Sequence, residues 1–196
     1  MERPILFSTL MVQAILAGRK TQTRRLMVCQ SGKWKGKQPI DVLPMNTPGE
    51  WVGLMQKEPN QGSVFKCRFG QIGDKLWVRE TYVGILDQEN KNRYYYKANS
   101  EDEEYIRKLG GIKWRPSIFL PRWASRITLV ITDVRVQRLQ EISHADITAE
   151  GLGDGYTEIG WNYTFGQLWN SINEKKGHGW STNPFVWAIT FKKEAK

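Results

Sequence analysis

The chain opens with an apolar and polar pattern that predicts a short strand followed by an amphipathic helix. We expect the strand over Ile5–Phe7, and Ser8 is a natural N-cap for the helix that follows it. Met11 and Ile15 stack one turn apart on a single face, as in a helix that buries one stripe. Gly18 stands where a helix C-cap is expected, so the helix is predicted to end there.

Residues 29–62 show little periodicity. Glycines and prolines punctuate this stretch, among them Gly32, Gly36, Pro39, Pro44, Pro48, Gly49, Pro59 and Gly62. Because both residue types interrupt helices and strands, we predict a long insertion or surface loop here. A second insertion is expected at about residues 84–113.

The rest of the chain has the pattern of short strands separated by a few helices. Strands are predicted over Val64–Phe69, Lys75–Tyr82, Tyr94–Lys97, Arg126 to about Arg138, and Phe185–Lys192. Helices are predicted from a Ser143/Asp146 capping box to about Gly151, and over Thr164–Lys176. This mixture favours an α+β fold in a single domain of residues 1–196, a small mixed β-barrel flanked by short helices.

Charge is distributed unevenly along the chain. Of 196 residues, 29 are Lys or Arg and 20 are Asp or Glu, which gives a formal net charge of +9. Residues 1–100 hold 16 basic and 8 acidic side chains, a net of +8, and the densest run is Arg19, Lys20, Arg24 and Arg25. The excess predicts an anionic partner such as RNA or a nucleotide. A solvated basic face is the alternative for this run.

Cysteine and histidine are scarce, with two of each. One disulfide at most is available, which excludes a disulfide scaffold and fits a reducing, cytoplasmic compartment. A zinc site usually needs about four closely spaced ligands, so no metal is expected. No cofactor is expected either, since Walker A and Rossmann glycine patterns are absent from the sequence. Polar residues break the N-terminal apolar run, so we expect neither a signal peptide nor a membrane span.

The helix exit Gly18–Arg25 is the first stretch that offers chemistry. A glycine there lets backbone N–H groups and cations approach an anion closely, which suits phosphate or carboxylate binding. Lys20 and Thr23 can converge across the turn, but a lysine activates a hydroxyl only if its pKa falls well below about 10.4. Neighbouring arginines and burial would lower that pKa. The alternative is a capped helix followed by an exposed basic strand.

The strand Lys75–Tyr82 carries a carboxylate within an apolar pattern. Period-two alternation sets Leu76, Val78 and Glu80 on one face. If that face is the inner one, Glu80 is buried and needs a cation or a ligand as its partner. An ion pair with an arginine and a role in ligand binding both stay open.

Aromatic and cationic residues interleave between Lys113 and Arg126, where Pro116 and Pro121 hold the chain extended. Such a segment is suited to stacking bases and contacting phosphates. The candidate contacts are Trp114, Arg115, Arg122, Trp123 and Arg126. The alternative is a core-packing connection whose arginines pair with acids.

Several of these stretches resemble the ASCH domain family. The family's G-x-K-x-x-x-x-R pattern matches Gly18, Lys20 and Arg25, and Gly73–Glu80 resembles the G-D-containing strand that follows it. The closing strand also agrees in character. Trp114–Arg126 and Phe165–Asn173 further resemble the longer ASCH proteins common in phages and prophages.

The resemblance implies a PUA-like β-barrel, related to RNA-binding domains, with a basic cleft around Gly18, Arg19, Arg24 and Arg25. Some bacterial ASCH proteins are amidohydrolases that deacetylate 4-acetylcytidine with a Lys, a Thr three residues later and a Glu. Lys20 and Thr23 match the first two residues, and Glu150 matches the third, with Glu80 as its rival. Other relatives are thought to bind RNA or to cleave it.

Two classes of function therefore stand. One is a binding module for RNA or a nucleotide, based on the basic first half and the Trp/Arg segment. The other is an enzyme in which Thr23 attacks an acyl carbon, Lys20 removes its proton, and Arg25 or backbone N–H groups hold the oxyanion. A ribonuclease is a further enzymatic alternative.

Overall fold

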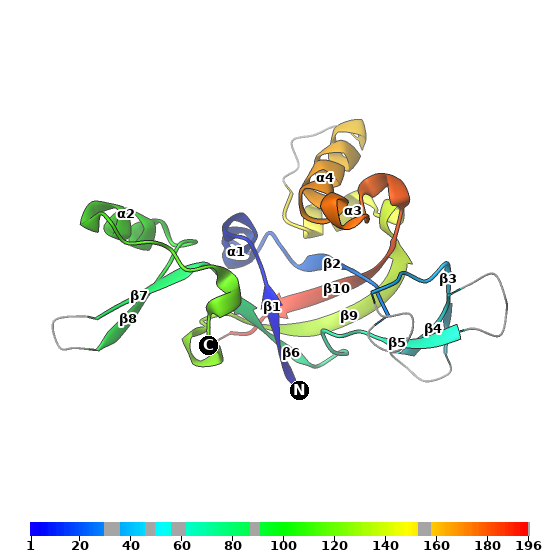
Figure 1. Ribbon diagram of the computed structural model, residues 1–196, viewed down its shortest axis with the longest axis horizontal. Helices are drawn as coiled ribbons and strands as arrows, with labels where there is room; N and C mark the ends of the chain where they lie inside the picture. The colour runs from blue at the N-terminus through cyan, green and yellow to red at the C-terminus, as the bar shows by residue number, and fades with distance from the viewer. Residues whose placement is uncertain (30–35, 46–49, 56–61, 87–90, 153–157, 196) are drawn as a thin grey trace.

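Five strands form the central sheet of the computed structural model, in the order β1–β6–β9–β10–β2 (Figure 1). The structure describes residues 1–29, 36–45, 50–55, 62–86, 91–152 and 158–195. β1 runs parallel to β6, and the other pairs of this sheet are antiparallel. The strands are β1 (Glu2–Leu6), β2 (Gln22–Leu26), β6 (Lys75–Arg79), β9 (Thr128–Arg138) and β10 (Phe185–Lys193). Helices are interspersed with these strands along the chain, so the predicted α+β class is confirmed.

Helix α1 (Thr9–Leu16) connects β1 to β2, the two edge strands of the central sheet. It begins and ends as the sequence predicts: the Ser8 side chain accepts a hydrogen bond from the Met11 N–H, and Gly18 follows with a φ of 74°. A residue with a side chain pays a steric cost at such a φ, which is why glycine ends the helix. Within the described residues, α1 rather than strand pairing links the two edges of the sheet.

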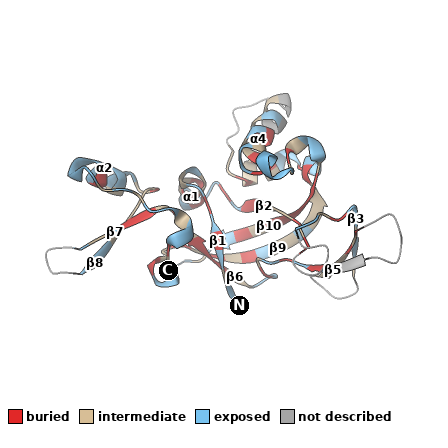
Figure 2. Ribbon diagram, in the orientation of Figure 1, coloured by how far each residue is buried: buried red, intermediate tan, exposed pale blue. Residues whose placement is uncertain are grey.

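Strand β10 is buried on both faces (Figure 2). Trp187 and Ile189 face the main core, as period-two alternation predicts. Val186 between them is fully buried in a second core, beneath α3 (His144–Ala149) and α4 (Glu158–Asn173). The sequence indicated one buried face, and the second is buried because α3 and α4 cover it.

The loop predicted over residues 29–62 is wrong for much of the described part of that stretch. β3 (Asp41–Pro44), β4 (Glu50–Leu54) and β5 (Gly62–Lys66) form an antiparallel sheet. Trp51 of β4 packs edge-on against Trp187 with ring centroids 4.9 Å apart, which fastens this sheet to the main core. Most prolines and glycines of the described part lie at or beyond the strand ends, where they mark turns, whereas Gly53 lies within β4, where the Phe65 ring leaves no room for a side chain. Residues 30–35, 46–49 and 56–61 lie outside the described residues.

The second stretch, at about 84–113, contains most of a hairpin and a helix. The hairpin is β7 (Tyr82–Leu86) with β8 (Asn92–Tyr96), and the helix is α2 (Ser100–Leu109). Figure 1 shows this unit reaching away from the central sheet. The side chain of Asn99 caps α2, and the acidic first turn suits the positive end of the helix dipole.

The remaining predicted elements occur with shifted ends. The strand expected over Lys75–Tyr82 is divided, because β6 ends at Arg79 and β7 begins at Tyr82. The strand expected over Val64–Phe69 lies in β5, which ends at Lys66. α4 begins six residues before the predicted Thr164, at Glu158. Within the described residues, every helix is too short or too polar to cross a membrane.

Candidate functional site

The sharp turn after α1 directs Lys20 into the protein. The N–H groups of Arg19 and Lys20 both donate to the Ala14 carbonyl, at 2.9 and 3.1 Å, so the chain reverses directly after Gly18. Lys20 is then 2% exposed, and it pairs with Glu150 in an isolated antiparallel bridge. The expectation of an exposed basic strand after the helix is wrong here, because the neighbouring chain covers this segment.

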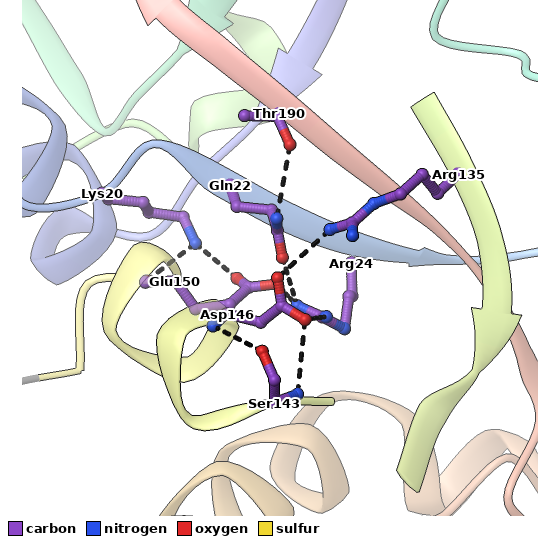
Figure 3. A network of polar contacts seen from close by, with 8 residues as sticks. All are labelled: Lys20, Gln22, Arg24, Arg135, Ser143, Asp146, Glu150 and Thr190. Atoms are coloured by element: carbon purple, nitrogen blue, oxygen red, sulfur yellow. Dashed lines mark hydrogen bonds and ion pairs between the residues drawn. The ribbon is translucent and has the colours of Figure 1, made fainter. Parts of the chain in front are cut away.

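Glu150 lies between two buried cations (Figure 3). Lys20 Nζ is 2.6 Å from Glu150 Oε2 and also donates to the Glu150 carbonyl at 2.9 Å. Arg24 Nη1 is 3.3 Å from the other carboxylate oxygen, Oε1. Each oxygen of the carboxylate thus faces a different cation, which fixes its orientation. Burial of this kind is tolerated because the charges are paired and hydrogen-bonded.

Asp146 extends the same network from the first turn of α3. Its carboxylate accepts from the Ser143 backbone in the predicted capping box, and it lies 2.9 Å from Arg24 Nη2 and 3.1 Å from Arg135 Nη2. Burial alone would raise the pKa of Asp146, but the Arg24 charge and a hydrogen bond from Gln22 outweigh it and lower the pKa to about 2. Asp146 is therefore ionised at neutral pH.

The ammonium group of Lys20 has an altered proton affinity. Burial lowers the pKa of Lys20, the charge and hydrogen bond of Glu150 oppose that effect, and the charges of Arg25 and Arg24 add to it. The net result is a lysine that releases its proton more readily than an exposed one. A lysine of this kind next to a carboxylate is chemically equipped to accept a proton from a nearby hydroxyl.

A cleft of about 540 Å³ opens beside this network. Glu150 is the one acidic side chain among its described lining residues, which include four arginines and one lysine: Arg24, Arg25, Arg68, Arg79 and Lys176. Phe165 and Trp169 of α4 line the cleft as well. We call this feature the arginine cleft. Its walls are apolar and aromatic, and its charge is positive.

Thr23 lines the arginine cleft together with Glu150. Side chains from both faces of the edge strand β2 line the cleft. Thr23 lies opposite Ile189 of β10, on the face toward the main core, and Arg24 lies on the other face, toward Asp146 of α3. Thr23 is 3% exposed, and no described residue forms a hydrogen bond with its hydroxyl. Lys20 lies behind Glu150. Among the described residues, both hydrogen-bond acceptors of Lys20 Nζ belong to Glu150, so no hydrogen bond joins Lys20 to Thr23.

Glu80, the rival carboxylate, lies elsewhere. It is 1% exposed, as alternation along the strand predicts, and accepts two hydrogen bonds of 2.9 Å from Arg126. The Arg126 guanidinium also lies 4.3 Å from the centroid of the Tyr96 ring. Burial would lower the pKa of Arg126, but the hydrogen bond and charge of Glu80 outweigh it and raise that pKa. The structure therefore has the ion pair with an arginine, and Glu150 is the carboxylate that meets Lys20.

The segment between Lys113 and Arg126 contacts the arginine cleft at one residue, Ile118. Its other candidates lie apart from Lys20 and Glu150: Arg122 pairs with Glu2 at 2.9 Å, Arg115 bridges to Tyr82 through its backbone, and Trp114 is half-buried. Trp123 is 70% exposed and packs edge-on against Tyr94. Gly18 and Arg19 are exposed at the helix exit, where Arg19 donates to the Gly151 carbonyl.

Sequence reasoning missed several residues of the arginine cleft. Arg68 follows β5 in a stretch with no motif, so nothing in the sequence marked it. Arg79 lies on the strand face opposite Leu76 and Val78, and this alternation was the one feature of the sequence that could have marked it as a residue outside the main core. Phe165 and Trp169 fall within the helix predicted over Thr164–Lys176, and they line the cleft while remaining 3% and 5% exposed.

Three or more His, Cys, Asp or Glu side chains do not gather into a metal-binding group anywhere in the described residues. Cys29 and Cys67 are buried and are not joined by a disulfide.

No family model and no curated protein matches the chain. Two solved structures are similar in backbone. The ASCH domain from Lactobacillus crispatus JV V101 is 14% identical with a TM-score of 0.41, over 93% of this chain and 70% of that one. Protein EF3133 from Enterococcus faecalis V583 is 12% identical with a TM-score of 0.42, over 98% of this chain and 81% of that one.

Proposed function

We propose that the arginine cleft binds a nucleotide unit, free or within a single strand of RNA. The observation that carries this proposal is the composition of the cleft: among its described lining residues are four arginines and one lysine but a single carboxylate, that of Glu150. Its volume of about 540 Å³ suits a ligand of that size, since small-molecule sites commonly span about 300–1,000 Å³. The guanidinium groups suit phosphate oxygens, and the aromatic wall suits a base.

A longer strand of RNA would leave the cleft past Ile118. Two large aromatic side chains near Ile118 in sequence are open to solvent, Phe119 at 66% and Trp123 at 70%. Each offers a face on which a flanking base can stack, a contact worth about 1–3 kcal/mol per base. RNA would therefore bind more tightly than a single nucleotide.

Fluorescence anisotropy of labelled single-stranded RNA, at several salt concentrations, tests the proposal. Arg25→Ala should weaken binding and reduce the salt dependence, because one cation in the cleft is lost. Trp123→Ala should weaken the binding of RNA and leave the binding of mononucleotides unchanged. Arg107→Ala on α2 is the matched control, since Arg107 is exposed and does not line the cleft. Binding that is undetectable, insensitive to salt, or equal in Arg25→Ala and Arg107→Ala contradicts the proposal.

A second candidate function is hydrolysis of an acylated nucleoside. It is favoured by the Lys20–Glu150 pair beside Thr23 and by the lowered pKa of Lys20. The Thr23 Oγ would attack the acyl carbon as its proton passes to Lys20 in the unprotonated form of that amine, and Arg25 would hold the oxyanion. Lys20 would return the proton to the departing amine, and water would then hydrolyse the Thr23 ester.

Acetate release from 4-acetylcytidine tests this second function. Turnover should be lost in Thr23→Val, which keeps the size of the side chain and removes the hydroxyl. Turnover that persists in Thr23→Val, or that is absent in the parent, rules out this mechanism. Labelled single-stranded RNA incubated with the same proteins tests the ribonuclease alternative, for which Thr23-dependent fragments are the expected result.

A further inference from the structure

Three arginines of the arginine cleft lack acidic partners. Arg25, Arg68 and Arg79 form no ion pair with any described carboxylate. Other arginines of the chain do face a carboxylate at ion-pair distance: Arg24, Arg122, Arg126 and Arg135. One end of the cleft therefore gathers three positive charges with no described carboxylate at ion-pair distance.

Two of these arginines lie beside Leu6, and the third shares an aromatic ring with one of them. Arg25 Nη2 donates to the Leu6 carbonyl at 2.6 Å, and the pairing of β1 with β6 places Arg79 directly beside Leu6. The guanidinium groups of Arg25 and Arg68 lie 5.9 and 5.3 Å from the centroid of the same ring, that of Phe69. Arg79 lies 4.7 Å from the centroid of its own strand neighbour, Trp77. Ring contacts of this kind orient a guanidinium while leaving its N–H groups available.

Two of these N–H groups are buried without an acceptor. Nε of Arg25 and Nε of Arg79 have no hydrogen-bond partner among the described residues. Buried donors without an acceptor are uncommon because they lower the stability of the folded protein. A ligand that supplies an acceptor removes this cost. Burial lowers the pKa of Arg25, the charge of Glu150 opposes that effect, and the charge of Arg68 adds to it, but an arginine of this kind remains protonated. An anion would relieve the missing hydrogen bonds and the repulsion together.

We infer that Arg25, Arg68 and Arg79 form a phosphate subsite, so that the ligand is a nucleoside phosphate and not an uncharged nucleoside. The inference rests on the proposed nucleotide binding and names its charged group. The phosphate would lie near Leu6, and the sugar and base would extend toward Thr23, Glu150 and the aromatic wall of α4. The phosphate comes either from a free mononucleotide or from RNA.

Isothermal titration with the four common nucleosides, their 5′- and 3′-monophosphates, and short RNA with and without a 5′-phosphate tests the inference. At least one monophosphate should bind tenfold or more tightly than its nucleoside. Arg68 is exposed, and Arg68→Gln should reduce the ratio of monophosphate affinity to nucleoside affinity to below threefold. The control Arg107→Gln should leave that ratio unchanged. If nucleoside and monophosphate bind with equal affinity, the phosphate subsite is wrong, but the proposal that the arginine cleft binds a nucleotide unit still stands. Preference for the mononucleotide or for RNA identifies the source of the phosphate.

If neither nucleosides nor monophosphates bind, titration with inorganic phosphate tests the phosphate subsite separately from the proposed nucleotide binding. The Nε–H resonances of Arg25 and Arg79, assigned by their loss in Arg25→Lys and Arg79→Lys, report directly on the unpartnered donors. Shifts of both resonances on titration with phosphate, reduced in Arg68→Gln, support the subsite even though nucleotide binding has failed. Resonances that do not move with phosphate overturn it.

Discussion

Replacing Glu150 with glutamine tests whether charge holds the Lys20–Glu150–Arg24 cluster together. The side chains of Lys20 and Glu150 are 1% and 6% exposed, and the Nζ–Oε2 distance is 2.6 Å. Glutamine keeps the shape and one acceptor oxygen but leaves buried Lys20 without a counter-charge, whereas Arg24 keeps its ion pair with Asp146. Removing one partner of a buried ion pair costs about 3–5 kcal/mol, so we expect the free energy of unfolding at pH 7 to fall by that amount. In a chain of this size that corresponds to a fall in Tm of about 10 °C.

The loss should shrink as the pH rises. The charge and hydrogen bond of Glu150 hold up the pKa of Lys20 against the effect of burial, so that pKa falls further in Glu150→Gln. The folded variant then releases the Lys20 proton at a pH where the unfolded chain, with the ordinary lysine value of 10.5, still keeps it. Because the unfolded state binds more protons over that interval, the stability of the variant rises with pH.

Urea unfolding followed by tryptophan fluorescence at pH 7 and pH 9 measures both effects. Glu103→Gln on α2 makes the same change of charge at an exposed position, and it should alter the free energy of unfolding by less than about 0.5 kcal/mol. A loss below about 1 kcal/mol in Glu150→Gln refutes the reasoning, because a buried charge left unpaired costs more than that. A difference between variant and parent that is independent of pH refutes it equally.

Three further predictions concern stability. Asp146→Asn should lower the free energy of unfolding by about 2 kcal/mol at pH 7. Since the pKa of Asp146 is lowered from 3.8 to about 2, that contribution is complete above 3.8 and disappears as the pH falls through about 2, which acid titration of both proteins will show. Glu80→Gln should cost about 3–5 kcal/mol, and adding Arg126→Met should recover part of the loss in a double-mutant cycle. Gly18→Ala should lower the free energy of unfolding, measured by thermal melting, by about 1–2 kcal/mol. The cost comes from the φ of 74° and not from a clash, because nothing lies within 4 Å of the added Cβ.

Elements marked by local contacts were predictable from the sequence. Ser8 and Gly18 delimit α1, and the Ser143/Asp146 capping box begins α3, because each signal acts over a few neighbouring residues. Strand β10 was equally clear from its alternation. Alternation also placed Glu80 in the core, since burial of a strand face depends on the same period.

Partners far apart in the sequence were not predictable. Both Glu80 and Glu150 were compatible with Lys20, and the choice depended on the packing of β9, which brings Arg126 to Glu80. The arginine cleft was harder to predict, because its lining residues come from β1, β2, the chain after β5, the end of β6, and α4. A periodic pattern says which face of an element is buried, but it does not say which elements meet.

The position of β10 between β9 and β2 has a consequence for the biosynthesis of the site. Residues 22–26 find their strand neighbours only at 186–190, so β2 lacks a partner until nearly all of the chain described here has been made. The same holds for Lys20, whose counter-charge is Glu150. Pairing across so many residues requires closing a very long loop, which slows folding. The site should therefore assemble late, as one of the last parts of the protein to become ordered, and a nascent chain that stops before β10 should carry Thr23 and Lys20 but no ligand-binding cleft.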